Sequence, residues 1–413
     1  MGKSATFFMD DVSIFDNAAN INVFPNFLIG EMGSYLQGDV DRDAIGDVVG
    51  QSVGYNALTR YNRDPQNPWF GGIFSYSLSR REEGNLYPQL SIGGAFNRRD
   101  LELLALLPDS VTDKNGETSV VPDPVTNADG FLGFTLKNGG MIGSHIYVAV
   151  QEGANVVNGE LGVDTSGSPL FSHKISTYIF KGDVGFNWPL ARNVDGEFSF
   201  GLATVRFGPS SVTWQNSFFM KARSFSTLEL INGELVPIIS YSNYNAPGLS
   251  ESSLNIGIGV NASLDRGFFW LGVESVFDKT EKTGYYTSGE SGDREVYDVN
   301  DTRVSEEIIQ GGKISFGIER NVWWDWLVVR VGGQKLIAYR EQRYAGKKSY
   351  HLTTNPISNG TQDDHVGWGL GLNVEEKLKF DVTMSEDFPY TLGNILSGPQ
   401  HHVLTRISAT YSF

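Results

Sequence analysis

The sequence predicts an all-β fold: a transmembrane, antiparallel, up-and-down β-barrel of about sixteen strands. Three observations support this prediction. Many segments alternate strictly between apolar and polar residues, short and long connections alternate along the chain, and the last ten residues, LTRISATYSF, form one more alternating strand. The 413 residues contain no run of 18 apolar residues, which excludes a helical membrane span.

Strict alternation gives a strand one apolar and one polar face, because successive side chains point to opposite sides. In SLNIGIGVNASL (253–264) every even-numbered residue is apolar, and every odd-numbered residue is Ser, Asn or Gly. The segments KISFGIE (313–319), WGLGLNV (368–374) and LKFDVTM (378–384) repeat this pattern. In a barrel the apolar face would meet lipid and the polar face would line the lumen.

The connections sort into two classes. Short ones such as RNVDG (192–196) and DRG (265–267) contain the Gly, Asn and Asp that tight hairpin turns require. Between them lie longer polar stretches at 38–67, 98–129, 153–171, 279–308, 342–363 and 387–400, with 207–212 and 245–252 as modest members. Transmembrane barrels have short periplasmic turns and longer extracellular loops, whereas a soluble sandwich or propeller has no reason to sort its loops in this way.

Counting with that alternation gives sixteen strands and returns both termini to the periplasmic side. The expected strands lie near 26–37, 68–80, 87–98, 129–138, 143–152, 172–189, 194–207, 212–231, 234–244, 252–264, 267–278, 309–320, 324–342, 363–374, 377–386 and 402–413. If the two strands within 207–250 are one excursion, the count falls to fourteen. Residues 1–25 then form an N-terminal periplasmic lead-in or a lumenal plug, and residues 26–413 form the barrel.

The tryptophans collect at two levels of the predicted strands. Trp188, Trp270, Trp323, Trp324 and Trp326 fall at one end, and Trp69 and Trp214 fall at the other. Amphipathic rings at two levels are typical of the aromatic girdles that flank the lipid-facing band of a barrel.

The composition limits the function classes. The formal charge of −16 argues against nucleic acid as a partner, since phosphate binding needs clustered Lys and Arg. Cysteine is absent, which removes thiolate chemistry and suits export through an oxidising periplasm. Only six histidines occur, and no hydrolase, metalloprotease or P-loop motif is present, so we expect neither enzymatic activity nor a cofactor beyond a loop-bound calcium ion.

The chain ends on an alternating strand that leads to Tyr411 and a terminal Phe413. This ending, from Val403 onward, resembles the C-terminal signal by which bacterial outer-membrane proteins are recognised for assembly. The resemblance implies a porin-like barrel in the outer membrane, with lipid, lipopolysaccharide and the barrel-assembly machinery as partners. The start, MGKSATFFMDD, lacks the apolar core of a signal peptide, so we expect the natural start to have been replaced by Met1.

A second, narrower resemblance concerns residues 16–30, DNAANINVFPNFLIG. This segment is similar to the approach to the first strand in the fatty-acid transporter (FadL) and PorV-like barrels, through Asn17, Asn22, Pro25 and Asn26. In those families an N-terminal segment enters the lumen as a plug. The sequence departs from them in having Asn26 where alanine would follow the proline, and in predicting sixteen strands where those families have fourteen.

Charged residues on the predicted lumenal faces are the candidate functional residues, because a Lys or Arg on the lipid face costs about 2–4 kcal/mol at mid-membrane. They are Glu197, Glu274, Lys313, Glu319, Arg330, Lys379, Asp381 and Arg406. Such charges would either set the ion selectivity of a water-filled pore or fill the lumen as a ladder of paired charges.

These features favour a passive, porin-type channel for small solutes. One alternative is a non-conducting barrel that serves as a scaffold, adhesin or secretion-system subunit through its long loops. Another is a FadL-like uptake channel for hydrophobic compounds. The sequence pattern does not distinguish a monomer from a homo-oligomer or from a subunit of a secretion complex.

The long loops are acidic and raise the question of a metal site. In GDVDRDAIGD (38–47), Asp39, Asp41 and Asp43 occupy alternate positions and are candidate ligands for calcium, which prefers oxygen donors. The stretch lacks the glycine at position 6 and the glutamate at position 12 of an EF-hand loop. The alternative is an acidic rim that is solvated, or is bridged by divalent cations to lipopolysaccharide phosphates.

Overall fold

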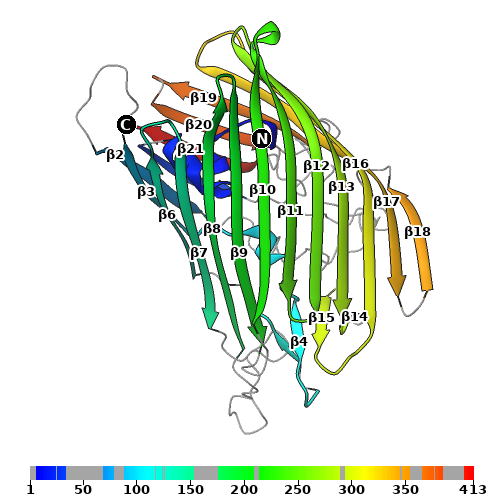
Figure 1. The fold of residues 1–413 in the computed structure, drawn as a ribbon. Coiled ribbons are helices and arrows are strands. Elements are labelled where there is room, and N and C mark those ends of the chain that lie inside the picture. The colour runs from blue at the N-terminus through cyan, green and yellow to red at the C-terminus, as the bar shows by residue number, and fades with distance from the viewer. Residues whose placement is uncertain are drawn as a thin grey trace, which may run out of the picture.

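The computed structural model describes residues 6–24, 26–33, 68–78, 88–116, 118–122, 124, 126–152, 175–208, 214–288, 294–344, 347–353, 365–375, 377–384 and 404–413. Their main sheet is antiparallel and closes on itself (Figure 1). It contains seventeen strands, of which sixteen form the barrel wall, while β18 (Lys347–Thr353) extends one end of β17. The predicted sixteen-stranded barrel is confirmed, and the alternative of fourteen strands is wrong.

No helix in the described part of the chain is long and apolar enough to cross a membrane.

The wall strands follow one another around the barrel in chain order. They are β1 (Phe27–Gly33), β2 (Trp69–Ser77), β3 (Gln89–Phe96), β6 (Thr126–Thr135), β7 (Met141–Glu152), β8 (Ser176–Ala191), β9 (Val194–Gly208), β10 (Gln215–Leu228), β11 (Gly233–Ala246), β12 (Leu249–Leu264), β13 (Gly267–Thr283), β16 (Val304–Asn321), β17 (Leu327–Tyr344), β19 (His365–Val374), β20 (Leu378–Met384) and β21 (Leu404–Ser412). β1 pairs with both β2 and β21, so no strand of the wall is left as an edge.

The two ends of the barrel differ in their connections. At the short-turn end most connections are brief: residues 192–193 join β8 to β9, and residues 265–266 join β12 to β13. The other end, called here the long-connection end, carries most of the long segments and lies at the bottom of Figure 1. The prediction of a modest loop at 245–252 is wrong, because Pro247 and Gly248 alone join β11 to β12, with Gly248 at a φ of 72° that favours glycine.

The outer surface of the barrel is apolar. On β12, Ile256 and Ile258 point outward and are 52% and 46% exposed, whereas Gly259 and Asn261 on the opposite face are buried. The odd-numbered residues of KISFGIE likewise face the lumen, and Ile314, Phe316 and Ile318 face outward. The alternation seen in the sequence therefore assigns the two faces correctly on these strands.

An insert between β3 and β6 fills part of the lumen at the long-connection end. It contains α2 (Leu101–Leu104), β4 (Ser110–Thr112) and β5 (Thr118–Val120), and β4 pairs with β15 (Arg294–Asp298), whose hairpin partner is β14 (Tyr285–Ser288). Leu103, Leu104, Leu106 and Leu107 pack against inward-facing residues of β7, β8 and β9, namely Tyr147, Ala149, Ile179, Ala203, Val205 and Phe207. The expectation of polar lumenal faces is wrong here, because the insert supplies an apolar partner.

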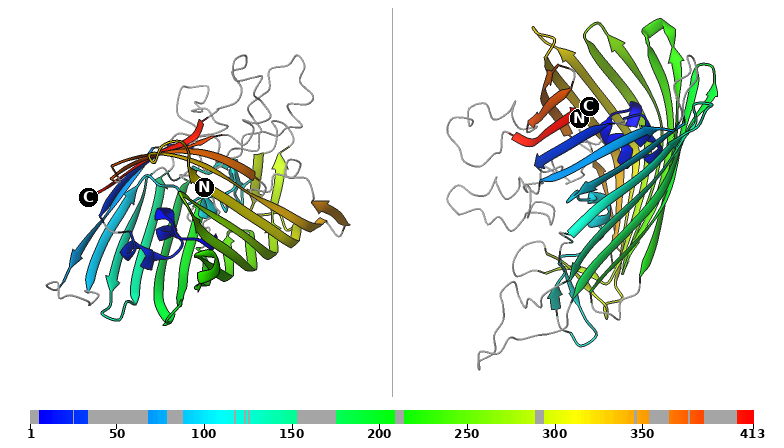
Figure 2. Two further views of the ribbon diagram at one scale, coloured as in Figure 1. Left: turned by 90° about the horizontal axis from the view of Figure 1, so that it is seen from above. Right: turned by 90° about the vertical axis from the view of Figure 1, so that its left-hand side faces the viewer.

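The N-terminal segment also lies inside the barrel. Residues 6–24 form short 3₁₀ helices, including η2 (Asp11–Phe15) and η3 (Ala18–Asn22), on the inner side of the wall (Figure 2). η3 rests on β3, β6, β7 and β8, and Phe7 packs against Trp270 of β13. The segment therefore runs across the lumen from β13 to β3.

The tryptophan prediction is correct in part. Trp188, Trp214, Trp323, Trp324 and Trp326 are exposed as girdle residues should be. Trp270 and Trp69 are not exposed to the surroundings of the barrel. Trp270 faces the lumen and is buried by Phe7 and Phe8, while Trp69 is buried and donates a hydrogen bond from Nε1 to Glu31 at 2.9 Å. Both rings are held by lumenal partners rather than by lipid.

Candidate functional site in the barrel lumen

Five inward-facing glycines form a seat for the N-terminal segment, called here the glycine seat: Gly133, Gly143, Gly185, Gly259 and Gly272. A Cβ at Gly185 would lie 1.8 Å from Asn17 Oδ1, and one at Gly143 would lie 2.1 Å from the carbonyl oxygen of Ala18. A Cβ at Gly259 or Gly272 would overlap the ring of Phe7, at 2.3 and 2.1 Å. Any larger residue at these positions would exclude the segment as it now lies.

Polar side chains of the wall hold the backbone of the segment. Arg223 on β10 forms a buried ion pair with Glu197 on β9, and its Nη1 donates to the carbonyl oxygens of Thr6 and Phe8 at 3.0 and 3.2 Å. Asn261 on β12 donates to the carbonyl oxygen of Phe7 at 2.8 Å. These donors satisfy backbone groups that no strand pairs.

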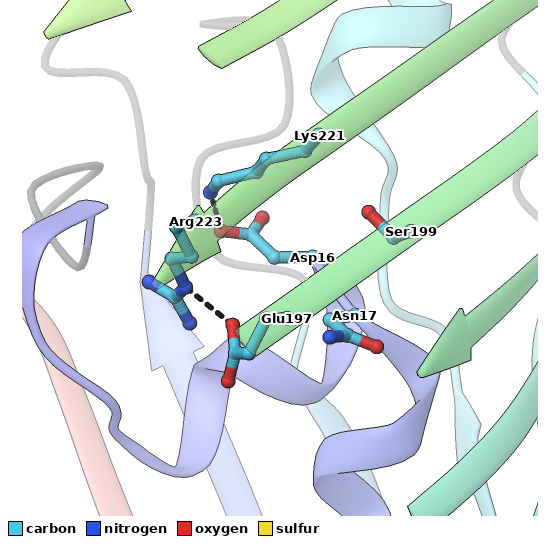
Figure 3. A pocket seen from close by; sticks show the side chains of 6 residues that line it. All are labelled: Asp16, Asn17, Glu197, Ser199, Lys221 and Arg223. Atoms are coloured by element: carbon cyan, nitrogen blue, oxygen red, sulfur yellow. Dashed lines mark hydrogen bonds and ion pairs between the residues drawn. The ribbon is translucent and has the colours of Figure 1, made fainter. Parts of the chain in front are cut away.

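A small polar pocket lies beside this anchor, lined by Asp16, Asn17, Glu197, Ser199, Lys221 and Arg223 (Figure 3). Lys221 Nζ lies 2.7 Å from Asp16 Oδ2, and Asn17 donates to Asn187 at 2.7 Å. Desolvation inside the barrel opposes ionisation of Asp16, whose side chain is 45% exposed, but the ammonium of Lys221 outweighs it, so the pKa of Asp16 lies below its usual value. The segment is thus bound to the wall by charge as well as by shape.

A buried cluster of charged residues joins β6, β7 and β8 to the start of the β3–β6 insert. His145 lies between two carboxylates, with Nε2 at 2.8 Å from Asp129 Oδ1 and Nδ1 at 2.7 Å from Asp183 Oδ2. Arg98 donates to both oxygens of Asp129, at 2.8 and 3.0 Å, and stacks on the ring of Phe15, 3.9 Å from its centroid. The cluster therefore links the insert, the wall and the N-terminal segment.

Asp100 and Lys181 extend this cluster. Lys181 Nζ lies 3.0 Å from Asp100 Oδ2, and Asp100 also accepts from the backbone amide of Leu103 at 3.3 Å. Burial opposes the ionisation of Asp100, but Lys181 and Arg98 lower the pKa of Asp100 to about 2. Asp100 is thus a carboxylate that fixes the first turn of α2 to β8.

Sequence analysis missed this cluster. Asp129, His145, Lys181 and Asp183 all lie on inward faces of their strands, so a complete search for charges on polar faces would have found them. That Arg98 joins them could not be read from strand periodicity, because Arg98 lies outside any strand.

The opposite wall carries paired charges, some of them in contact with solvent and others, such as Glu274 and Arg330, buried. Near the short-turn end, Arg330 on β17 forms ion pairs with Glu319 on β16 and Asp381 on β20, and Lys379 Nζ lies 3.5 Å from Asp381. Deeper along the lumen, Lys313 lies 3.3 Å from Glu274.

Toward the long-connection end a further pair, Arg340 and Glu307, continues the row of charges. A buried apolar cluster of Val276, Leu336 and Ala338, with Ile309 packed against it, lies on the same inner faces. By the strand registers, this cluster separates the Lys313–Glu274 pair from the Arg340–Glu307 pair.

Access to solvent distinguishes the two sides of the lumen. The side chains of Asp129 and His145 are fully buried, whereas those of Glu319, Lys379 and Asp381 are 31%, 42% and 25% exposed. We call the side that contains Asp129 and His145 the dry side. The side formed by β13, β16, β17, β19 and β20 is called the wet side.

The predicted site residues divide accordingly. Six belong to the wet side: Glu274, Lys313, Glu319, Arg330, Lys379 and Asp381. Glu197 lies instead beneath the N-terminal segment, paired with Arg223. Arg406 lies in β21 opposite Gly33, and the structure describes its backbone but not its side chain.

The remaining predicted positions lie elsewhere. Tyr411 and Phe413 stack on each other at the outer surface. Asp39, Asp41 and Asp43 lie outside the described residues, so the calcium prediction stays a prediction. Within the described ranges, no group of three or more His, Asp or Glu side chains is placed to hold a metal ion.

The chain matches no protein-family model and no curated protein. Among solved structures it is similar to the siderophore receptor PirA from Acinetobacter baumannii, with 12% identity over 94% of this chain and 69% of that one and a TM-score of 0.27. It is also similar to the ferric-catecholate import receptor Fiu from E. coli K12 (9% identity, 94% and 81% covered, TM-score 0.31). The ferric yersiniabactin uptake receptor FyuA from Yersinia pestis gives 8% identity, 94% and 80% covered, and a TM-score of 0.30. Sequence identities and TM-scores this low do not assign the chain to a family. The FadL resemblance stays a prediction.

Proposed function

We propose that the protein is an outer-membrane channel that admits small polar solutes along the wet side of its lumen. The observation that carries this proposal is the difference in solvent access between the two sides of the lumen. The N-terminal segment and the β3–β6 insert cover the dry side, while three charged side chains of the wet side, Glu319, Lys379 and Asp381, keep contact with water.

The membrane location rests on the outer surface and the closed wall. The closed wall of sixteen strands leaves none of them as an unpaired edge, and outward residues such as Ile256, Ile258 and Phe316 expose apolar surface that lipid would cover. The terminal strand, with its exposed Tyr411 and Phe413, fits the assembly signal inferred from the sequence. Outer-membrane lipid, lipopolysaccharide and the assembly machinery are the partners that this location implies.

The charges of the wet side suggest what the channel admits. Four acidic residues, Glu274, Glu307, Glu319 and Asp381, pair with four basic residues, Lys313, Arg340, Arg330 and Lys379. Equal numbers of positive and negative charges favour weak ion selectivity. Such a row would admit dipolar solutes as well as ions of either sign. The apolar cluster around Leu336 interrupts this row. Its side chains are buried, so a passing solute would have to uncover them, and we expect this step to set the size limit.

A route for hydrophobic compounds would need a continuous apolar lining, which the charged row on the wet side does not supply. This favours polar solutes over a FadL-like substrate.

Single-channel conductance of the purified protein in a planar lipid bilayer tests the proposal. Steady ohmic steps with a reversal potential near zero in a salt gradient are expected. Replacing Leu336 with Ala should raise the conductance, and the outward-facing Ile337→Ala is the matched control that should not. Absence of any conductance from correctly folded protein would contradict the channel and favour a scaffold, adhesin or secretion role.

A further inference from the structure

The N-terminal segment is attached to the wall without any strand pairing. None of the described residues 6–24 joins the sheet, and the backbone amides of this segment bond locally, as when Asn20 N donates to the carbonyl oxygen of Asn17. All sixteen wall strands find their partners without it. Removing the segment would therefore break no backbone ladder of the barrel.

The wall is nevertheless shaped for this one segment. Ala18, Ala19, Ile21 and Phe7 are fully buried, and the glycine seat supplies the space for them. Glycine weakens a strand, because it adds conformational entropy to the unfolded chain and packs no side chain. Five glycines whose missing side chains are replaced by the same segment indicate a site built for an occupant.

The wall recognises the occupant mainly through its backbone and its amides. Arg223 and Asn261 bind the carbonyl oxygens of residues 6–8, and Asn187 both accepts from Asn17 and donates to Asn20, at 2.7 and 2.6 Å. These contacts require a peptide with a Phe that can be buried at one end and with small residues, here Ala18 and Ala19, between Asn17 and Asn20. The chemistry is that of peptide recognition.

We propose that the glycine seat, with Arg223, Asn187 and Asn261, is a peptide-binding site whose occupant is residues 6–24 of this chain, and that this occupant can leave and rebind. The released segment uncovers Gly143 and Gly185 on the dry side, and a separate peptide of the same sequence binds in its place. This inference does not depend on solute passage, because it concerns the binding of the segment.

The direct test uses a variant that lacks residues 2–24 and a fluorescent peptide with the sequence of residues 6–24. The peptide is expected to bind this variant in detergent with one-to-one stoichiometry, measured by fluorescence anisotropy. Gly185→Val in the same variant should weaken binding at least tenfold. Gly182→Val is the matched control on the same strand, because a Cβ at Gly182 has no neighbour closer than 3.9 Å, and binding should be unchanged.

A peptide carrying Ala18→Leu and Ala19→Leu should fail to bind, since both alanines are fully buried against the wall. No binding of the natural peptide to a variant whose far-UV circular dichroism shows an intact barrel would overturn the proposal. Equal binding by the Gly185→Val and Gly182→Val variants would also overturn it.

The full-length chain gives an independent test that does not need the truncated protein to fold. Gly185→Val should raise hydrogen exchange across residues 6–24 while the wall strands stay protected, and Gly182→Val should not. Unchanged exchange in Gly185→Val would contradict the seat. Because neither assay measures conductance, failure here is separable from failure of the channel proposal.

Discussion

The backbone amide of Phe413 donates a hydrogen bond to the carbonyl oxygen of Asn26 at 3.0 Å, so the last residue of the chain is tied to the residue that precedes the first strand. The Phe413 ring also lies 5.5 Å from that of Phe74 and 6.2 Å from that of Tyr411. The terminal aromatic residue is therefore part of the seam that closes the barrel.

Deleting Phe413 should lower the yield of assembled barrel in the outer membrane, because the seam loses both a backbone hydrogen bond and an aromatic contact. Heat-modifiable mobility on gels of membrane fractions measures the assembled fraction. Phe413→Tyr keeps the ring and the amide and should assemble normally. An undiminished yield after deletion would remove the role assigned to this residue.

Ile258→Arg should block insertion or folding, because Ile258 faces outward and a lipid-facing Arg costs about 2–4 kcal/mol at mid-membrane. Asn255 lies on the inward face of the same strand, so Asn255→Arg should be tolerated. Folding into lipid vesicles, followed by tryptophan fluorescence, distinguishes the two. Equal folding of both variants would refute the assignment of faces on β12.

Arg330→Gln should make the channel prefer cations. The change leaves the carboxylates of Glu319 and Asp381 without their shared guanidinium, so the wet side gains net negative charge. The reversal potential in a salt gradient measures the preference. Arg266→Gln, at the exposed turn between β12 and β13, is the control and should leave the reversal potential unchanged. A shift of equal size in both variants would argue against a path past Arg330.

Asp100 should contribute to the pH dependence of stability. Its pKa of about 2 lies below the value of about 3.9 for an unfolded aspartate, so its stabilising effect is present above pH 4 and is lost as the pH falls through about 2. The free energy of unfolding should decrease by about 2 kcal/mol through this group over that range. Denaturant unfolding in detergent at several pH values measures the decrease.

Asp100→Asn should remove this part of the pH dependence, whereas Asp195→Asn, at an exposed position, should retain it. A wild-type profile between pH 4 and pH 2 that Asp100→Asn leaves unaltered would show that the ion pair with Lys181 is not formed.

The sequence predicted the number and order of the wall strands because the environment of a barrel imposes a simple rule on each strand separately. Lipid demands alternate apolar residues, and tight turns demand Gly, Asn or Asp, so both signals are local. The lumenal charges Lys313 and Arg330 were found in the same way.

What could not be predicted depends on contacts across the lumen. Gly185 and Asn17 are far apart in the sequence, and no periodicity reveals that one makes room for the other. The lumenal glycines were therefore interpreted as pore lining, although several of them hold a segment of the chain. Trp270 was misplaced for the same reason, since its partner Phe7 comes from the opposite end of the sequence.

The buried cluster on the dry side has a consequence for the order of folding. Arg98, Asp129, His145 and Asp183 all come from one continuous stretch of the chain, between the end of β3 and the middle of β8. Their contacts require only neighbouring strands, and loop closure over so short a stretch is cheap. This part of the wall can therefore neutralise its own charges as a partly closed sheet, before β21 reaches β1.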